Sequence, residues 1–261
     1  MLKITAINQY GQSLQVNQNS LFRTTAAGLN PPPGSIFTAD LATKNGSLFN
    51  GSKVNNRNII LTIYPTGRDV AAARLDLFRV FKVSQYIRLQ IETEKRTCYA
   101  VGYVEDMPSE YDDPAQNFAV SIICPDPFLV AATETTAAVP TAGTAVAVTN
   151  AGDFETGAEF TITATGSCSG LTFANATTGQ TFGVNVTLAT GDKLTLKTQQ
   201  GEKSLMLTRS GEAPTNALNL MASGSVWPIL QPGVNNIAFN ATSGGANASM
   251  AVKFSALFGG V

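Results

Sequence analysis

The side chains that most often carry enzymatic chemistry are scarce in this sequence. Its 261 residues contain no histidine, which removes Ser-His-Asp and Cys-His nucleophilic triads and His-Glu-x-x-His zinc sites. It also has no Gly-x-Ser-x-Gly elbow, no Walker loop and no Gly-x-Gly-x-x-Gly turn that opens a helix. A carboxylate pair or a Ser-Lys pair remains formally open as the basis of a hydrolase. We expect no catalytic residue, no cofactor and no enzymatic activity.

Residues that could bind metal or form disulfides are also few. The carboxylates gather at residues 105–114, but their spacing does not match an Asp-x-Asp-x-Asn-Gly calcium loop. We therefore predict no metal site. The three cysteines, Cys98, Cys124 and Cys168, are too few for a disulfide scaffold and are typical of reduced, buried residues. A paired or reactive role for Cys98 and Cys124 stays open, because they could lie on neighbouring strands.

One tryptophan is a candidate for ligand binding. Trp227 could stack on a sugar ring, with Asn235, Asn236 and Asn240 as the nearest polar partners. It is flanked by valine, isoleucine and leucine, however, which is more typical of a core or lid residue. Both interpretations, a possible glycan contact and a packing residue, remain open from the sequence.

The sequence changes in composition at residues 114–130, and we interpret this stretch as the boundary between two domains. Residues 1–130 carry 12 Lys and Arg against 11 Asp and Glu, whereas residues 131–261 carry only 5 against 7. Alternation from Phe118 to Cys124 predicts a partly buried strand, and Pro125 and Pro127 end it because neither can donate to a sheet. We predict two domains, 1–130 and 131–261.

The first domain is predicted to be α+β. Strands are expected at residues 2–7, 13–22, 58–64, 86–92, 97–104 and 118–124. The prolines within residues 28–34 predict a stiff extended segment. Residues 37–51 contain two Asn-Gly turn signals and are expected to be loop.

One helix is predicted, at residues 70–83, with Asp69 as its N-cap. Its apolar residues form a wide face that includes Leu75 and Phe78. The arginines and lysine around that face could meet phosphate, but nearby aspartates offset them, so a solvated outer face is preferred.

The second domain is predicted to be a β-sandwich of jelly-roll type. Short strands are expected at residues 159–164, 171–174, 182–188, 193–198, 203–208, 234–240 and 249–256, with glycine-containing turns between them. Residues 133–152 are low in complexity and are read as a flexible connection or an edge strand.

Several motifs, in this order and spacing, resemble the siphophage distal tail protein (Dit) family. They are GLNPP at 28–32, GSKVNNRNIIL at 51–61, the helix at 75–81, CYAVGYV at 98–104 and VSIICPDPF at 120–128. The turn LQPGVNNI at 230–237 is similar to one in the family's second domain. The resemblance covers most of the first domain and only this turn of the second.

This resemblance implies a structural virion protein at the tail tip. The first domain would form a homohexameric ring around the DNA channel, and the second would be a galectin-like sandwich. The implied partners are its own copies, the tail tube protein, a tail-associated hub or lysin protein, and receptor-binding or baseplate proteins. The resemblance implies assembly in the host cytoplasm. It implies no sequence-specific binding of nucleic acid and no insertion into a membrane.

The matching motifs give ring or domain-seam candidates. These are Asn30, Pro31, Pro32, Lys53, Arg57, Pro125, Asp126 and Pro127. The chain lacks the histidine of the galectin sugar signature, so the resemblance implies a docking platform instead of an inherited glycan site. The alternative is a carbohydrate-binding tail adhesin that recognises the host.

Overall fold

The chain folds into two compact units. The computed structural model describes residues 2–17, 21–43, 45–66, 69–109 and 117–261. Unit 1 comprises Met1–Ala132 together with Phe258–Val261, and unit 2 comprises Thr133–Leu257. This division differs from domains at 1–130 and 131–261 because the chain returns to unit 1 at residue 258. Most of the acidic stretch, and the beginning of the predicted seam, fall in residues 110–116, outside the described residues.

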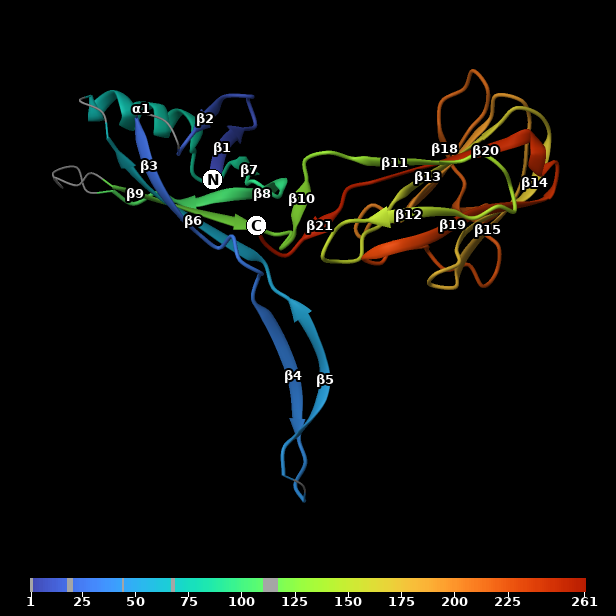
Figure 1. The fold of residues 1–261 in the computed structure, drawn as a ribbon, viewed down its shortest axis with the longest axis horizontal. Coiled ribbons are helices and arrows are strands. Elements are labelled where there is room, and N and C mark those ends of the chain that lie inside the picture. The colour runs from blue at the N-terminus through green and yellow to red at the C-terminus, as the bar shows by residue number, and fades with distance from the viewer. Residues whose placement is uncertain (1, 18–20, 44, 67–68, 110–116) are drawn as a thin grey trace. The chain divides into compact units, whose positions relative to one another are not determined.

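Unit 1 is organised around one sheet (Figure 1) with the strand order β2-β1-β7-β8-β9-β6-β3. The strands are β1 (Lys3–Asn8), β2 (Ser13–Gln15), β3 (Phe22–Ala27), β6 (Arg57–Pro65), β7 (Tyr86–Glu92), β8 (Thr97–Asp106) and β9 (Phe118–Cys124). A short strand, β10 (Leu129–Ala131), pairs with β8 and with β21 (Leu257–Phe258). In β9 every second residue is buried, as the alternation in the sequence predicts, because successive side chains of a strand point to opposite faces.

The helix begins where the sequence predicts. The Asp69 carboxylate accepts a hydrogen bond of 2.8 Å from the Ala72 amide, which satisfies one of the free N–H groups at the helix start. Helix α1 (Val70–Val80) buries Ala73, Leu77 and Val80. The predicted wide apolar face is wrong in part, because Leu75 is 68% exposed. The buried face is therefore a narrow stripe.

Residues 37–51 are not a loop. They belong to a two-stranded antiparallel hairpin, β4 (Gly34–Asp40) and β5 (Ser47–Val54), which extends beyond the sheet of unit 1 (Figure 1). The pairing contains a bulge, where Phe37 opposes Gly51 and Thr38 opposes Phe49. Gly51 has a φ of 137°, which a side chain would not tolerate well.

Unit 2 is a two-sheet β-sandwich, and the predicted fold class, mainly β with an α+β first domain and a β-sandwich second domain, is confirmed. One sheet has the order β11-β20-β13-β16-β17-β18 and the other β12-β19-β14-β15. The strands are β11 (Thr135–Val139), β12 (Val146–Asn150), β13 (Glu159–Ala164), β14 (Cys168–Asn175), β15 (Gln180–Leu188), β16 (Lys193–Lys197), β17 (Ser204–Thr208), β18 (Thr215–Asn216), β19 (Gly233–Ser243) and β20 (Ala248–Phe254). Two short 3₁₀ helices, Leu218–Leu220 and Gly245–Asn247, lie in its connections.

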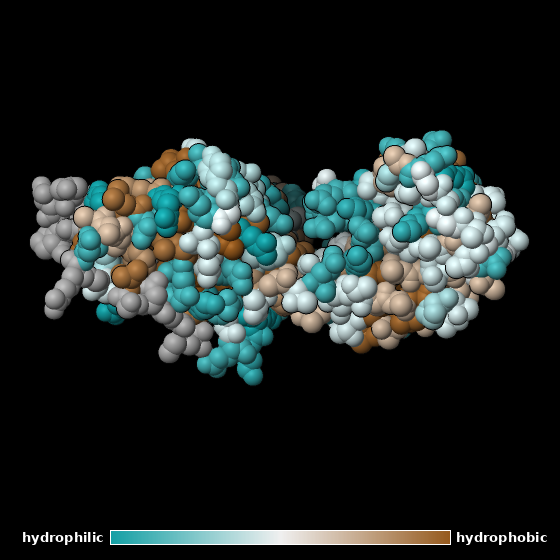
Figure 2. Space-filling model, turned by 90° about the horizontal axis from the view of Figure 1, so that it is seen from above, coloured by the Kyte–Doolittle hydropathy of each residue, from teal (hydrophilic) through white to brown (hydrophobic). Residues whose placement is uncertain are grey.

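The core of unit 2 lies between its two sheets. Phe160 of β13 and Phe173 of β14 are fully buried, with ring centroids 6.1 Å apart. Residues 133–152 supply an edge strand to each sheet, so the flexible-connection alternative for them is wrong. The surface of unit 2 in Figure 2 is largely pale, near-neutral residues, in keeping with its low charge.

A buried carboxylate joins two turns of unit 2. Asp192, only 3% exposed, accepts hydrogen bonds from the Ala189 and Ser210 amides at 2.9 and 3.0 Å. It also pairs with the Arg209 guanidinium at 2.6 Å. The Ala189 amide, with further help from Arg209 and Ser210, lowers the pKa of Asp192 from its ordinary value.

Among the described residues, no helix is long and apolar enough to span a membrane.

Candidate functional site: the exposed hairpin and its root

The hairpin carries large apolar side chains that no other part of the described chain covers. Its exposed apolar residues are Ile36 (71%), Phe37 (50%), Leu48 (54%), Phe49 (63%) and Val54 (41%). The register places Ile36, Phe49 and Val54 on one face and Phe37 and Leu48 on the other. A two-stranded ribbon with two apolar faces is marginal in water. Such a surface is typical of an interaction site.

The root of the hairpin, in contrast, is held by hydrogen bonds and close packing. The Asn55 amide donates to the Pro33 carbonyl at 2.8 Å, and the Asn55 side chain is hydrogen-bonded to Ser35 at 2.9 Å. Gly28, where β3 ends, has a φ of 82°, and a Cβ there would lie 2.0 Å from the Asn58 carbonyl oxygen. Only glycine fits this approach, so the chain can pass this close to β6 only with glycine at position 28.

Arg57 is the centre of this root. Its side chain is 1% exposed, and all four of its acceptors are main-chain carbonyl oxygens. Nη1 donates to Gly28 and Asn30 at 2.6 and 2.8 Å, Nε to Pro127 at 2.7 Å, and Nη2 to Gly259 at 2.6 Å. Burial lowers the pKa of Arg57 from its ordinary value, but a guanidinium remains charged at neutral pH.

One of the seam candidates, Pro127, contacts this arginine and supplies one of its acceptors. Asp126 fixes the same bend, because its carboxylate accepts from the Phe128 amide at 3.1 Å, while Pro125 is exposed. The bend after β9 is therefore held by the Arg57 bond to Pro127 and by the Asp126 bond to Phe128, and its role as a geometric device stays a prediction.

The remaining ring candidates lie just before the hairpin or within it. Asn30 and Pro31 are exposed and Pro32 is half-buried, just before β4, and Lys53 is exposed on β5 opposite Ser35. The structure thus brings Asn30, Arg57 and Pro127 together and leaves Lys53 on the hairpin. The apolar hairpin residues were not predicted as a site, although the Asn45-Gly46 turn signal between apolar stretches could have indicated a hairpin.

Trp227 lies in unit 2 and packs against the sandwich core. Its ring is 4.7 Å from that of Phe182 and is half-buried. Its expected polar partner Asn235 is fully buried and already engaged: its side-chain Nδ2 donates to the Gln231 carbonyl at 2.8 Å, and its Oδ1 accepts from the Asn175 side chain at 3.0 Å. These contacts favour the packing interpretation of the tryptophan over the glycan interpretation.

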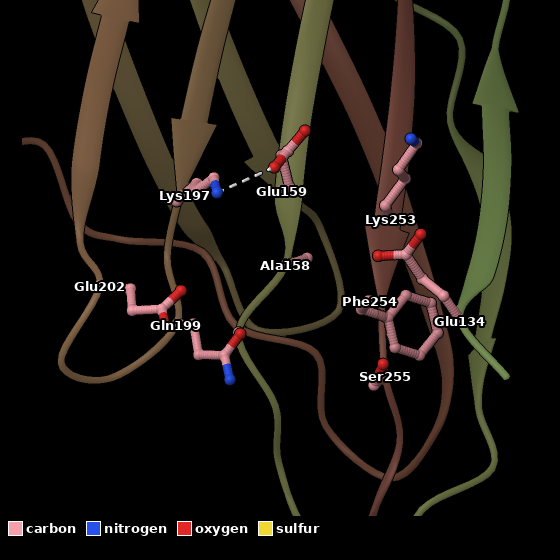
Figure 3. Close-up of a pocket in the computed structure, with 10 residues that line it drawn as sticks. Glu134, Ala158, Glu159, Lys197, Gln199, Glu202, Lys253, Phe254 and Ser255 are labelled. Atoms are coloured by element: carbon pink, nitrogen blue, oxygen red, sulfur yellow. Dashed lines mark ion pairs between the residues drawn. The ribbon is translucent and has the colours of Figure 1, made fainter. Parts of the chain in front are cut away.

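A polar pocket in unit 2 is a second candidate (Figure 3). Glu159 stands between Lys197 and Lys253 in the strand register, and it pairs with Lys197 at 3.4 Å. Glu134 and Glu202 also line the pocket. Opposite charges on neighbouring strands stabilise a sheet surface, which accounts for these residues without a ligand.

The cysteines do not form a reactive centre. All three are buried and free. Burial raises the pKa of Cys98 and of Cys124 to about 11, so both are neutral thiols at physiological pH and poor nucleophiles. Across the described residues, no cluster of three or more His, Cys, Asp or Glu side chains could hold a metal ion.

Comparisons with known proteins agree with this architecture. Residues 151–256 match the family model "Siphovirus-type tail component, C-terminal domain". The fold is similar to that of phage SPP1 Dit, with a TM-score of 0.73, 16% identity, and coverage of 98% of this chain and 99% of that one. That protein is described as a paradigm of the hub adsorption apparatus in phages that infect Gram-positive bacteria.

The other similarities are weaker. A chain of the phage p2 baseplate in its activated conformation has a TM-score of 0.45 and 10% identity over 97% of this chain and 98% of that one. No curated protein matches the sequence. The resemblance to the distal tail protein family is confirmed, by the family match over residues 151–256 and by the fold over the whole chain.

Proposed function

Because the chain carries the fold of a distal tail hub protein, we propose that it is a structural component of a phage tail tip. Unit 1 assembles as a homohexameric ring that continues the DNA channel of the tail tube. Unit 2 serves as an outward platform for receptor-binding or baseplate proteins. The mature protein resides in the virion after assembly in the host cytoplasm, and it has no enzymatic activity.

The observation that carries the ring is the β4–β5 hairpin. A ring requires each copy to present one surface to a neighbour and a different surface to the neighbour on its other side. The hairpin offers one of these surfaces, with two apolar faces and two strand edges that pair with no other strand among the described residues. The occupant we propose for it is unit 1 of a second copy, because covering both faces would remove the exposed apolar area from water.

The rigidity of the root supports the same proposal. A contact that must close after a fixed number of copies needs a defined angle between neighbours. Gly28, Asn55 and Arg57 hold the hairpin at one exit from the sheet. In this proposal the seam residues Pro125, Asp126 and Pro127 shape the bend after β9, and Asn30, Pro31, Pro32 and Lys53, which lie beside or on the hairpin, would contact the neighbouring copy.

The other proposed partners follow from this arrangement. The tail tube protein would meet one face of the ring, and the tail-associated hub or lysin protein the other. Net charges near zero in both halves of the sequence agree with a channel through which DNA passes without specific binding.

The experiment is a native mass measurement of the whole purified chain, alone and mixed with its tube and hub partners. A species of six chains, in either sample, is the expected result. A chain that stays monomeric in both samples would overturn the proposal.

A further inference from the structure

The last described residues form a segment that leaves the sandwich and docks on unit 1. Strand β20 ends at Phe254 within unit 2, whereas Phe258–Val261 belong to unit 1. Phe258 is 8% exposed, and the Val261 amide donates to the Leu29 carbonyl at 3.3 Å. Unit 2 is therefore connected to unit 1 twice, once after Ala132 and once before Phe258.

Two arginines of unit 1 hold this segment. Arg96 donates through Nη1 to the Gly260 carbonyl at 2.7 Å, and its guanidinium lies 4.4 Å from the centre of the Phe258 ring, a cation–π arrangement. Arg57 donates to the adjacent Gly259 carbonyl at 2.6 Å. Two charged side chains therefore donate hydrogen bonds to two successive carbonyl oxygens of the segment, those of Gly259 and Gly260.

The same Arg57 side chain also holds the hairpin root and the bend after β9. Its planar fork donates to Gly28 and Asn30 on one side and to Pro127 on another. A lysine could not reproduce this, because its ammonium is a point donor without a fixed fork. Loss of any one acceptor would leave a buried cation partly unsatisfied, which is costly.

We infer that Arg57 couples two parts of the fold. Docking of residues 258–261 on unit 1 and ordering of the hairpin root then occur together, because both depend on the same guanidinium. When the segment is docked, Nη2 is satisfied and the guanidinium is held in the plane that bonds Gly28 and Asn30. When the segment leaves, water reaches the guanidinium, the root loosens, and unit 2 keeps only its connection at Ala132. This coupling does not depend on ring formation.

The test uses a variant that loosens the segment without touching Arg57. A Cβ at Gly260 would lie 2.9 Å from the Leu29 carbonyl oxygen and 3.3 Å from Pro31 Cδ. Its backbone is outside the left-handed region, so Gly260→Ala acts only through these two contacts and a third, of 3.3 Å, with the Asn30 carbonyl carbon. The control is Gly34→Ala, whose Cβ would meet its nearest atom, the Lys53 carbonyl oxygen, at an ordinary 3.5 Å.

Hydrogen exchange on the full chain is the readout. In Gly260→Ala we expect exchange at least about tenfold faster at the Val261 amide and also at the Asn55 amide of the hairpin root. Strand β1 should be unchanged, and the Gly34→Ala control should resemble the parent protein. Arg57→Lys is expected to accelerate the same two amides. Faster exchange at Val261 with an unchanged Asn55, or no change at either amide in both Gly260→Ala and Arg57→Lys, would overturn the inference.

Discussion

Substitution of Phe49 by serine should weaken assembly while leaving the isolated chain as stable as before. The Phe49 side chain is 63% exposed. A phenylalanine buries roughly 200 Å² when fully covered, so a neighbouring copy would cover about 125 Å² more. At about 25 cal/mol per Å² this amounts to ~3 kcal/mol at each contact. The dissociation constant of each contact should rise about a hundredfold.

The assay is sedimentation velocity over a range of concentrations, with thermal unfolding measured on the same samples. Val234→Ser is the matched control, because Val234 is also an exposed apolar strand residue, 58% exposed, but lies in unit 2. The expected result is loss of the large species in Phe49→Ser alone, with similar melting temperatures for all variants. An unchanged association curve for Phe49→Ser, or an equal loss in the control, would refute the reasoning.

Three further predictions concern the seam and unit 2. The lowered pKa of Asp192, caused chiefly by the Ala189 amide, contributes stability that is present above the ordinary value near 3.8 and is lost as the pH falls through the folded pKa. Urea unfolding from pH 6 to pH 3 should therefore show a steep acid loss that Asp192→Asn flattens, and parallel curves would contradict this. Replacing Pro125 and Pro127 together by glycine should keep each unit folded but loosen their relative orientation, and small-angle scattering identical to that of the parent would count against it. Trp227→Ala should lower the unfolding free energy by about 1–3 kcal/mol in urea titration, because a half-buried ring loses part of the full core cost, and strong glycan-array binding that this substitution abolishes would instead favour an adhesin.

Local patterns in the sequence were sufficient for much of unit 1. The alternation of β9 and the Asp69 cap of α1 were both readable, because strand periodicity and capping depend on neighbouring residues alone. The exposed Leu75 was misjudged, since periodicity shows which residues share a face but not how far the sheet covers that face.

The hairpin and the return segment could not be obtained in the same way. Apolar residues on both faces of β4 and β5 give no alternation between apolar and polar positions, so residues 37–51 read as loop. The bond between Arg57 and Gly259 joins positions 202 apart in the chain, and no local signal predicts such a contact. Arg57 was nevertheless among the candidates, because residues 51–61 resemble a motif of the distal tail protein family.

The central claim is that the hairpin of one copy binds the next copy and that this contact closes into a ring. A photo-crosslinking amino acid at position 49 in the full chain, illuminated after assembly, tests it directly. The claim predicts a ladder of covalent products that stops at six chains, with crosslinks into unit 1 of the neighbouring copy. A ladder that continues beyond six, crosslinks confined to unit 2, or no product between copies would contradict it.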